Sequence, residues 1–153
     1  MNKAENLKQA LYNKCTVFTQ NRLNTINKTI EELQESLTSE TKSSAGDKHE
    51  TGRAMLQLER EKAGQQLAEV QKVNQLLAKI ELFKTSKTVA LGSLVFTSKA
   101  NYFIAISAGE FEVENQKFYA IAANTPIAQL LLGKTINDDI TFRDQNFKIT
   151  DVI

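Results

Sequence analysis

Two carboxylates, Asp47 and Glu50, stand three positions apart in the segment SSAGDKHETG at residues 43–52. Carboxylate oxygens are the ligands that Mg²⁺ prefers, but the ion takes about six oxygen ligands and keeps several waters. Two acids on one short segment can therefore hold it only together with oxygens supplied by a partner. The pair also fits a helix capping box, in which Asp47 accepts from backbone N–H groups and Glu50 reaches back to the cap. These residues alone favour the cap, and metal ligation stays open.

Other reactive side chains are scarce. Lys48, His49 and Arg53 flank the acids, and they are interpreted as exposed charge or as contacts to an anionic partner. His49 is the only histidine and Cys15 the only cysteine, which argues against a zinc site and rules out an intramolecular disulfide. Cys15 falls on an apolar helical stripe, which predicts a buried structural thiol. It lies many helical turns from His49, so a nucleophile with an adjacent histidine base is excluded.

The acids are expected at the end of a helical hairpin. Apolar residues recur at steps of three or four, with one step of five, which is typical of a narrow coiled-coil stripe about 45 Å long. They are Leu7, Leu11, Cys15, Phe18, Leu23, Ile26, Ile30, Leu33 and Leu37. After the glycine-serine break a second stripe follows, interrupted by Asn74, with Met55, Leu56, Ala63, Leu67, Val70, Leu77 and Ile80. Two such helices predict an antiparallel hairpin over residues 1–82, with its tip at 43–52.

The second part of the chain changes to the period of β-strands. Segments EFEVE, ITF and FKI alternate, and SLVFTS and NYFIAIS are β-branched and aromatic around a Lys99-Ala100 turn. NTPIAQLLLGK predicts a short helix, capped by Thr125, with Pro126 in its first turn and Gly133 at its end. The expected fold class is α+β: the helical hairpin followed by a small antiparallel sheet domain with one short helix over residues 88–153.

Composition limits the function further. The 153 residues carry a net charge of +1, which lacks the basic excess of a protein that grips nucleic acid by its phosphates alone. Any contact with nucleic acid must therefore be local. The longest apolar run, YFIAI at residues 102–106, is too short to span a bilayer, and a lone cysteine suits a reducing compartment. We expect a soluble, cytoplasmic protein without a membrane partner.

The layout of a long helical hairpin followed by a small sheet domain resembles the Gre transcript cleavage factors of bacterial RNA polymerase. At the tip, Gly46, Asp47 and Glu50 match that family's Gly-Asp pair with a glutamate three positions later. In the second domain, NTPIAQLLLGKTINDDITF is similar to the family's Ser-Pro-Ile-Ala segment and the strand that follows. The matching positions are Pro126, Ile127, Ala128, Gly133, Lys134 and Asp139.

The resemblance implies a function inside a polymerase complex. A C-terminal domain of the FK506-binding-protein type would dock near the mouth of the secondary channel, through Pro126, Ile127, Gly133 and Lys134. The hairpin would insert and donate its two tip acids to a Mg²⁺ shared with polymerase carboxylates, at the RNA 3′ end of a backtracked complex. The remaining tip residues, Lys48, His49 and Arg53, would contact RNA or the channel. The implied protein is not an enzyme alone, binds no cofactor by itself, meets DNA only indirectly, and is a monomer or self-associates weakly.

The tip also departs from the family pattern. Gre tips continue after the glutamate with Asn-Ala-Glu-Tyr, whereas this chain continues Thr51, Gly52, Arg53 and Ala54. An acid is replaced by a cation and an aromatic by a methyl group, so a channel regulator or competitor that does not stimulate cleavage stays open, as does a coiled-coil adaptor unrelated to polymerase. Prolyl isomerase activity is not expected, because the chain has no tryptophan and its aromatic pairs are assigned to the strand core. These are Tyr102, Phe103, Phe118 and Tyr119.

Overall fold

The chain forms two compact units, which the computed structural model describes for residues 2–42 and 47–153. The side chains of residues 41, 42 and 47–50 lie outside this description. One unit, here called the helical unit, is Thr19–Asn74. The other, the sheet unit, joins Met1–Phe18 to Gln75–Ile153. The boundary between the units therefore falls within both long helices and not in the segment after the second one.

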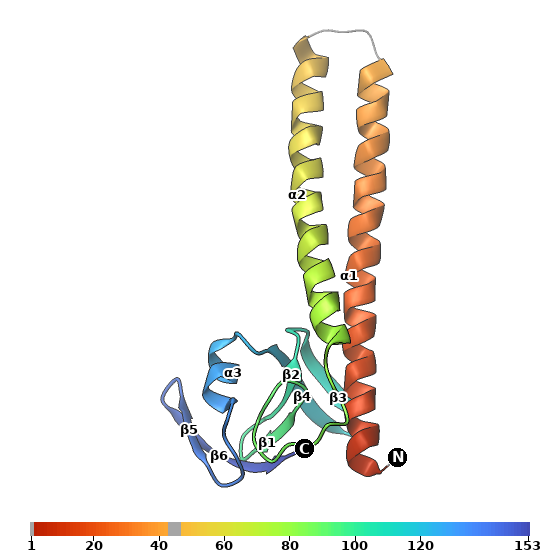
Figure 1. Cartoon of the computed structure of the whole chain (residues 1–153). Coiled ribbons are helices and arrows are strands. Elements are labelled where there is room, and N and C mark those ends of the chain that lie inside the picture. Colours follow the sequence, from red (N-terminus) through yellow and green to blue (C-terminus); the bar gives the residue numbers. More distant parts are fainter. Residues whose placement is uncertain (1, 43–46) are drawn as a thin grey trace. The chain divides into compact units, whose positions relative to one another are not determined.

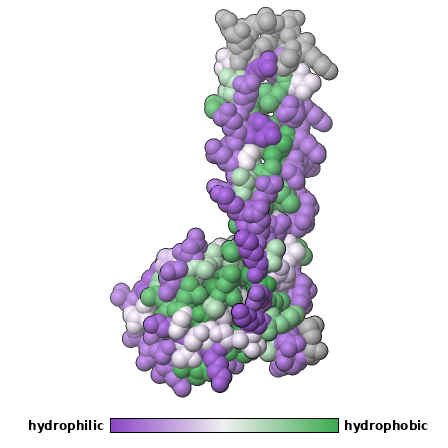
Figure 2. All heavy atoms as spheres, viewed as in Figure 1, coloured by the Kyte–Doolittle hydropathy of each residue, from purple (hydrophilic) through white to green (hydrophobic). Residues whose placement is uncertain are grey.

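Two long helices, α1 (Lys3–Lys42) and α2 (Asp47–Ala78), supply the whole helical unit (Figure 1). The expected stripe forms the seam between them, with Leu33, Ala63 and Val70 buried. In Figure 2 this seam is a hydrophobic band between hydrophilic flanks. Neither helix can hide such a stripe alone, so pairing of the two helices is what stabilises each of them.

A polar contact within the helical unit crosses the seam. The Thr19 hydroxyl, itself buried, lies 3.4 Å from Asn74 Oδ1 and donates to it. Asn74 is the residue at which the sequence stripe is interrupted, so the interruption is matched by a partner on the other helix. A polar pair across a helix seam favours the alignment in which its two members meet, because a shifted alignment would lose this hydrogen bond.

One detail of the expected hairpin was wrong. Met55 is not part of the seam but 59% exposed, because neighbouring helical residues point 100° apart and Leu56 occupies the inward position. The helix α2 begins at Asp47 and continues through Gly52, so the second part of the expected tip segment is helical. A single helical glycine costs only about 1 kcal/mol, which the packing of a long helix can offset.

The sheet unit contains a six-stranded sheet in the order β3-β4-β2-β1-β6-β5. Its strands are β1 (Leu94–Thr97), β2 (Asn101–Ala105), β3 (Gly109–Val113), β4 (Gln116–Ala122), β5 (Asp139–Phe142) and β6 (Gln145–Val152). All pairs are antiparallel except β2 with β4. The five segments expected as strands are confirmed, and β4 is added. The Lys99-Ala100 turn joins β1 to β2 as expected.

Both faces of the sheet are covered by apolar side chains. One face packs against α3 (Pro126–Leu131) around a cluster of ten buried residues, here called the α3 core. These are Val89, Val95, Ile104, Ile127, Ala128, Leu131, Ile140, Phe147, Ile149 and Val152. Residues alternate across a strand, so Leu94, Phe103 and Phe118 serve the opposite face, where the Phe118 ring meets Phe96 edge-on at 5.9 Å.

Local sequence explains how α3 begins and ends. The Thr125 side chain accepts from the Ala128 N–H at 3.4 Å. Pro126 occupies the first turn of α3, where its missing backbone N–H would have had no partner within the helix. Gly133 follows with a φ of +79°, a conformation that favours glycine. Its N–H donates to Val89 O at 2.8 Å, which ties the end of α3 to the segment before β1. The predicted α+β fold class, a helical hairpin with a mostly antiparallel sheet and one short helix, is confirmed.

Candidate functional site

The two tip acids are placed by the start of α2. Asp47 is the first helical residue, and Glu50 lies in the same first turn. Their side chains lie outside the described part of the chain, as do those of Lys48 and His49 and all of Gly46. Metal ligation and capping by Asp47 and Glu50 therefore both stay predictions.

The described residues that follow are exposed on α2. Arg53 and Ala54 face solvent, and Met55 and Leu58 are 59% and 66% exposed. Positions 54 and 58 are four apart and lie on one face of the helix, opposite the seam. A cation and exposed apolar side chains thus follow the acids along the first turns of α2.

The four positions expected to dock have different environments. Ile127 is buried in the α3 core, so its side chain holds the helix in place and offers no contact surface. Pro126, Gly133 and Lys134 are exposed. Lys134 is fixed through its backbone, since its carbonyl accepts from Val89 N–H at 2.8 Å. Leu130 and Ile136 add exposed apolar side chains to this region, and the sequence analysis did not single them out.

Two titratable groups of α1 are buried in the sheet unit. Cys15 is fully buried, as the sequence predicted, and this burial raises the pKa of its thiol to about 12. Lys8 is only 3% exposed, and desolvation lowers its pKa. Nothing in the sequence marked Lys8 as buried except its place beside Leu7 of the stripe.

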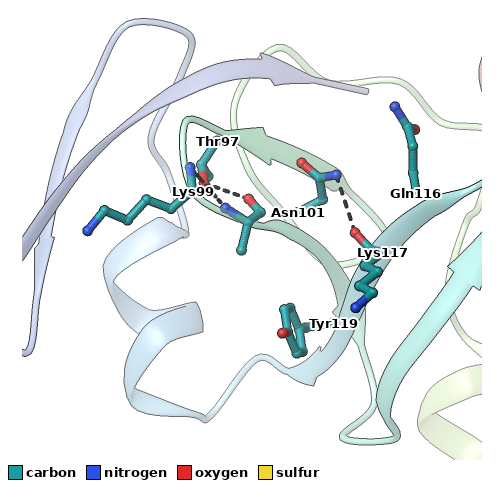
Figure 3. Close-up of a pocket in the computed structure, with 7 residues that line it drawn as sticks. Thr97, Lys99, Asn101, Gln116, Lys117 and Tyr119 are labelled. Atoms are coloured by element: carbon teal, nitrogen blue, oxygen red, sulfur yellow. Dashed lines mark hydrogen bonds between the residues drawn. The ribbon is translucent and has the colours of Figure 1, made fainter.

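A hollow that the sequence analysis did not predict lies on the sheet unit, between the β1–β2 turn and the start of β4. Its volume is about 420 Å³ (Figure 3). Here called the basic hollow, it is lined by Thr97, Lys99, Ala100, Asn101, Gln116, Lys117 and Tyr119. Two of these seven side chains are cationic and none is acidic. The hollow joins segments that are separated in sequence, which is why spacing alone does not reveal it.

The walls of the basic hollow are fixed by hydrogen bonds. Thr97 Oγ1 accepts from Ala100 N–H at 2.9 Å and donates to Ala100 O, which sets the turn that carries Lys99. Asn101 Nδ2 donates to Lys117 O at 3.3 Å, linking β2 to β4 (Figure 3). The two lysines are therefore carried by backbone that is held in place, while their own side chains are exposed.

The described part of the chain holds no group of three or more histidine, cysteine, aspartate or glutamate side chains that could bind a metal ion. Within the same residues, no helix is both long and apolar enough to traverse a lipid bilayer.

The sequence and the structure were compared with known proteins. No protein family matches the sequence, and no curated protein matches it. Among solved structures, one described as that of the transcription factor Gfh1 is similar over 99% of this chain and 95% of that chain, at 15% sequence identity and a TM-score of 0.34. A likeness of this size carries no functional argument.

Proposed function

We propose that the chain is an accessory factor of bacterial RNA polymerase, which inserts its helical hairpin into the secondary channel and there stimulates cleavage of backtracked RNA. The observation that carries the proposal is the position of Asp47 and Glu50 in the first turn of α2, where the hairpin reverses direction. The fold and the tip and α3 segments, which resemble those of Gre factors, support the same function.

The two acids fit a Mg²⁺ site that is shared with a partner, but they cannot form a complete site within this chain. Asp47 and Glu50 supply two carboxylates, and the described residues contain no cluster that could complete a site within the chain. Magnesium needs about six oxygen ligands, so the others would come from polymerase carboxylates, RNA phosphate and water. When bound, the ion lowers the pKa of the attacking water and neutralises charge on the leaving oxygen. Asp47 would be a ligand, and Glu50 would either ligate or orient the attacking water.

The helical unit suits the task of presenting two acids. Its seam is packed by Leu33, Ala63 and Val70, and the Thr19–Asn74 contact favours one alignment of the helices. From Thr19 to the end of α1 the helix is about 36 Å long at 1.5 Å per residue. A rigid pair of helices reduces the entropy lost when the acids are positioned in a partner's active centre.

A second candidate function is occupation of the channel without cleavage. The exposed cation Arg53, one turn after Glu50, favours it, because a positive charge near a carboxylate pair weakens the binding of a divalent cation. The same architecture would then compete with other channel factors.

The deciding experiment compares tip and control variants on stalled, backtracked elongation complexes. Asp47→Asn/Glu50→Gln removes the ligand charges, whereas Glu59→Gln/Glu61→Gln removes two exposed acids of the same helix. We expect the rate of RNA cleavage to fall by at least about 10-fold in the tip variant only. Circular dichroism and polymerase binding should not change in either variant.

The outcomes separate the candidates. Wild-type protein that binds polymerase and displaces another channel factor, but never accelerates cleavage, supports the competitor. Wild-type protein that fails to bind polymerase overturns both functions and favours a coiled-coil adaptor. If the tip variant only lowers the melting temperature, the acids act as a helix cap.

A further inference from the structure

We propose that the basic hollow of the sheet unit binds single-stranded nucleic acid, with one base stacked on Tyr119 and the neighbouring phosphates held by Lys99 and Lys117. The proposal is independent of the hairpin and its tip acids, and it concerns the isolated chain.

The size of the hollow fits a nucleotide. Its volume of about 420 Å³ lies within the range of small-ligand sites, which is about 300–1,000 Å³. Figure 3 shows Asn101 on one side of the space and Tyr119 on the other. Lys99 extends from the β1–β2 turn and Lys117 from β4, in different directions and on different sides of that space. An extended nucleic-acid strand, with one base stacked on Tyr119 and a phosphate near each lysine, matches this arrangement.

Charge favours an anionic ligand at this place. The chain as a whole carries only +1, but the hollow is lined by two lysines and no acid. Lys117 contacts Glu110 at 3.5 Å in an ion pair whose side chains are 68% and 42% exposed. Exposed pairs of this kind contribute little, so a phosphate can replace the carboxylate at small cost. Lys99 lies at the exposed β1–β2 turn.

The aromatic wall supplies the surface for a base. Tyr119 is 39% exposed, unlike its neighbours Phe118 and Ala120, which are buried. Its ring lies 6.1 Å from that of Tyr102 at an interplanar angle of 36°, so it is supported from the next strand. Burial, and to a lesser degree Tyr119, raises the pKa of Tyr102, which keeps that phenol neutral beside an anionic ligand. Stacking of a base on an aromatic side chain contributes about 1–3 kcal/mol and accepts any base.

The sheet topology argues against an acidic peptide as the occupant. An extended peptide usually binds a sheet by pairing with a free strand edge. Here β4 already pairs with β3 and β2, and β2 pairs with β1 and β4. The hollow therefore offers side chains and little unpaired backbone, which suits a nucleotide better than a polypeptide.

The test uses the full chain and fluorescein-labelled 12-residue single-stranded RNA and DNA, with binding followed by fluorescence anisotropy. Tyr119→Ala should raise the Kd at least about 5-fold, whereas Tyr119→Phe, which keeps the ring, should stay near wild type. Lys99→Ala/Lys117→Ala should weaken binding and lower the slope of log Kd against log salt by about 1.4, the value for two phosphates on a single strand.

A matched control isolates the site from general charge. Lys84→Ala/Lys87→Ala also removes two exposed lysines of the sheet unit, one of which forms an exposed ion pair with Glu81. It should leave the Kd within about 2-fold, the size of a surface effect. Thermal melting of every variant shows whether it is folded. If Tyr119→Ala does not fold, Tyr119→Phe and the lysine variants still test the proposal.

Three results would overturn the proposal: no binding by wild type at low salt, equal weakening by the control lysines, or Tyr119→Ala binding as tightly as wild type. Competition by a polyglutamate peptide as effective as that by unlabelled RNA would mean that the hollow recognises acidic polypeptides. Since no polymerase is present, these results do not depend on whether the hairpin enters the secondary channel.

Discussion

Arg53 is the described charged side chain closest in sequence to the tip acids, and its charge is opposite to theirs. Under the proposed function, a cation at this point would compete with Mg²⁺ for the carboxylates. The identity of this one residue would therefore affect how well the tip serves as a pair of metal ligands.

We expect Arg53→Glu to increase the rate of cleavage in backtracked complexes up to about 5-fold at limiting Mg²⁺, since exposed charges interact by about 0.2–1 kcal/mol. The measurement is the cleavage rate as a function of Mg²⁺ concentration. Lys62→Glu, the same charge change at another exposed site of α2, is the control. An equal gain from both variants would assign the effect to net charge and not to the tip.

Cys15 allows a prediction about pH. Its pKa is raised by burial from 9.0 to about 12, so the folded state holds the thiol proton that the unfolded state releases. The sign follows: the contribution of this proton to stability is complete below about pH 9 and is lost progressively as the pH rises toward about 12. Urea unfolding of wild type and Cys15→Ala at pH 8 and 10.5 checks it. The difference in unfolding free energy between the two proteins should shrink at the higher pH.

Each of the two long helices packs against the other through one face. The effect of a substitution on the free energy of unfolding should therefore depend on the face that carries it. Leu33 is buried in the seam and Leu58 is 66% exposed on the opposite side of its helix. An identical truncation at each position therefore separates packing from helix propensity.

We expect Leu33→Ala to lower the free energy of unfolding by about 2–3 kcal/mol, because it removes buried methyl groups and leaves a cavity. Leu58→Ala should change it by less than about 0.5 kcal/mol, the range of surface substitutions. Urea unfolding followed by circular dichroism measures both. A large loss at Leu58 would show that its face is covered in solution, for example by a second copy of the chain.

Over the whole molecule, periodic segments could be predicted from sequence and assembled surfaces could not. Stripes of three and four residues predicted α1 and α2, and alternation predicted most strands, because burial of one face imposes a period on the chain. β4 had no predicted range: as an inner strand that pairs parallel to β2, it gives the sequence no hairpin signal on that side. The boundary between the two units lies within the long helices and not after them. It is defined by contacts between segments distant in sequence, which no local pattern reveals.

The candidate sites show the same limit. Asp47 and Glu50 were found because they are near in sequence, and the structure adds only that they open α2. The basic hollow was missed because Lys99 and Lys117 are brought together by the parallel pairing of β2 with β4. Burial of Lys8 was missed for a related reason, since a lysine beside a stripe is ordinarily solvated.

The contact between Thr19 and Asn74 bears on distance as well as on stability. If the two helices slid past each other by a single turn, the start of α2 would move by about 5.4 Å along the hairpin. Oxygen atoms must approach Mg²⁺ to about 2.0–2.1 Å, so a displacement of that size would take the carboxylates out of reach. This contact between α1 and α2 thus bears on where the start of α2 stands, and a Thr19→Val/Asn74→Leu protein would keep a stable hairpin but lose the hydrogen bond that favours one alignment of its helices.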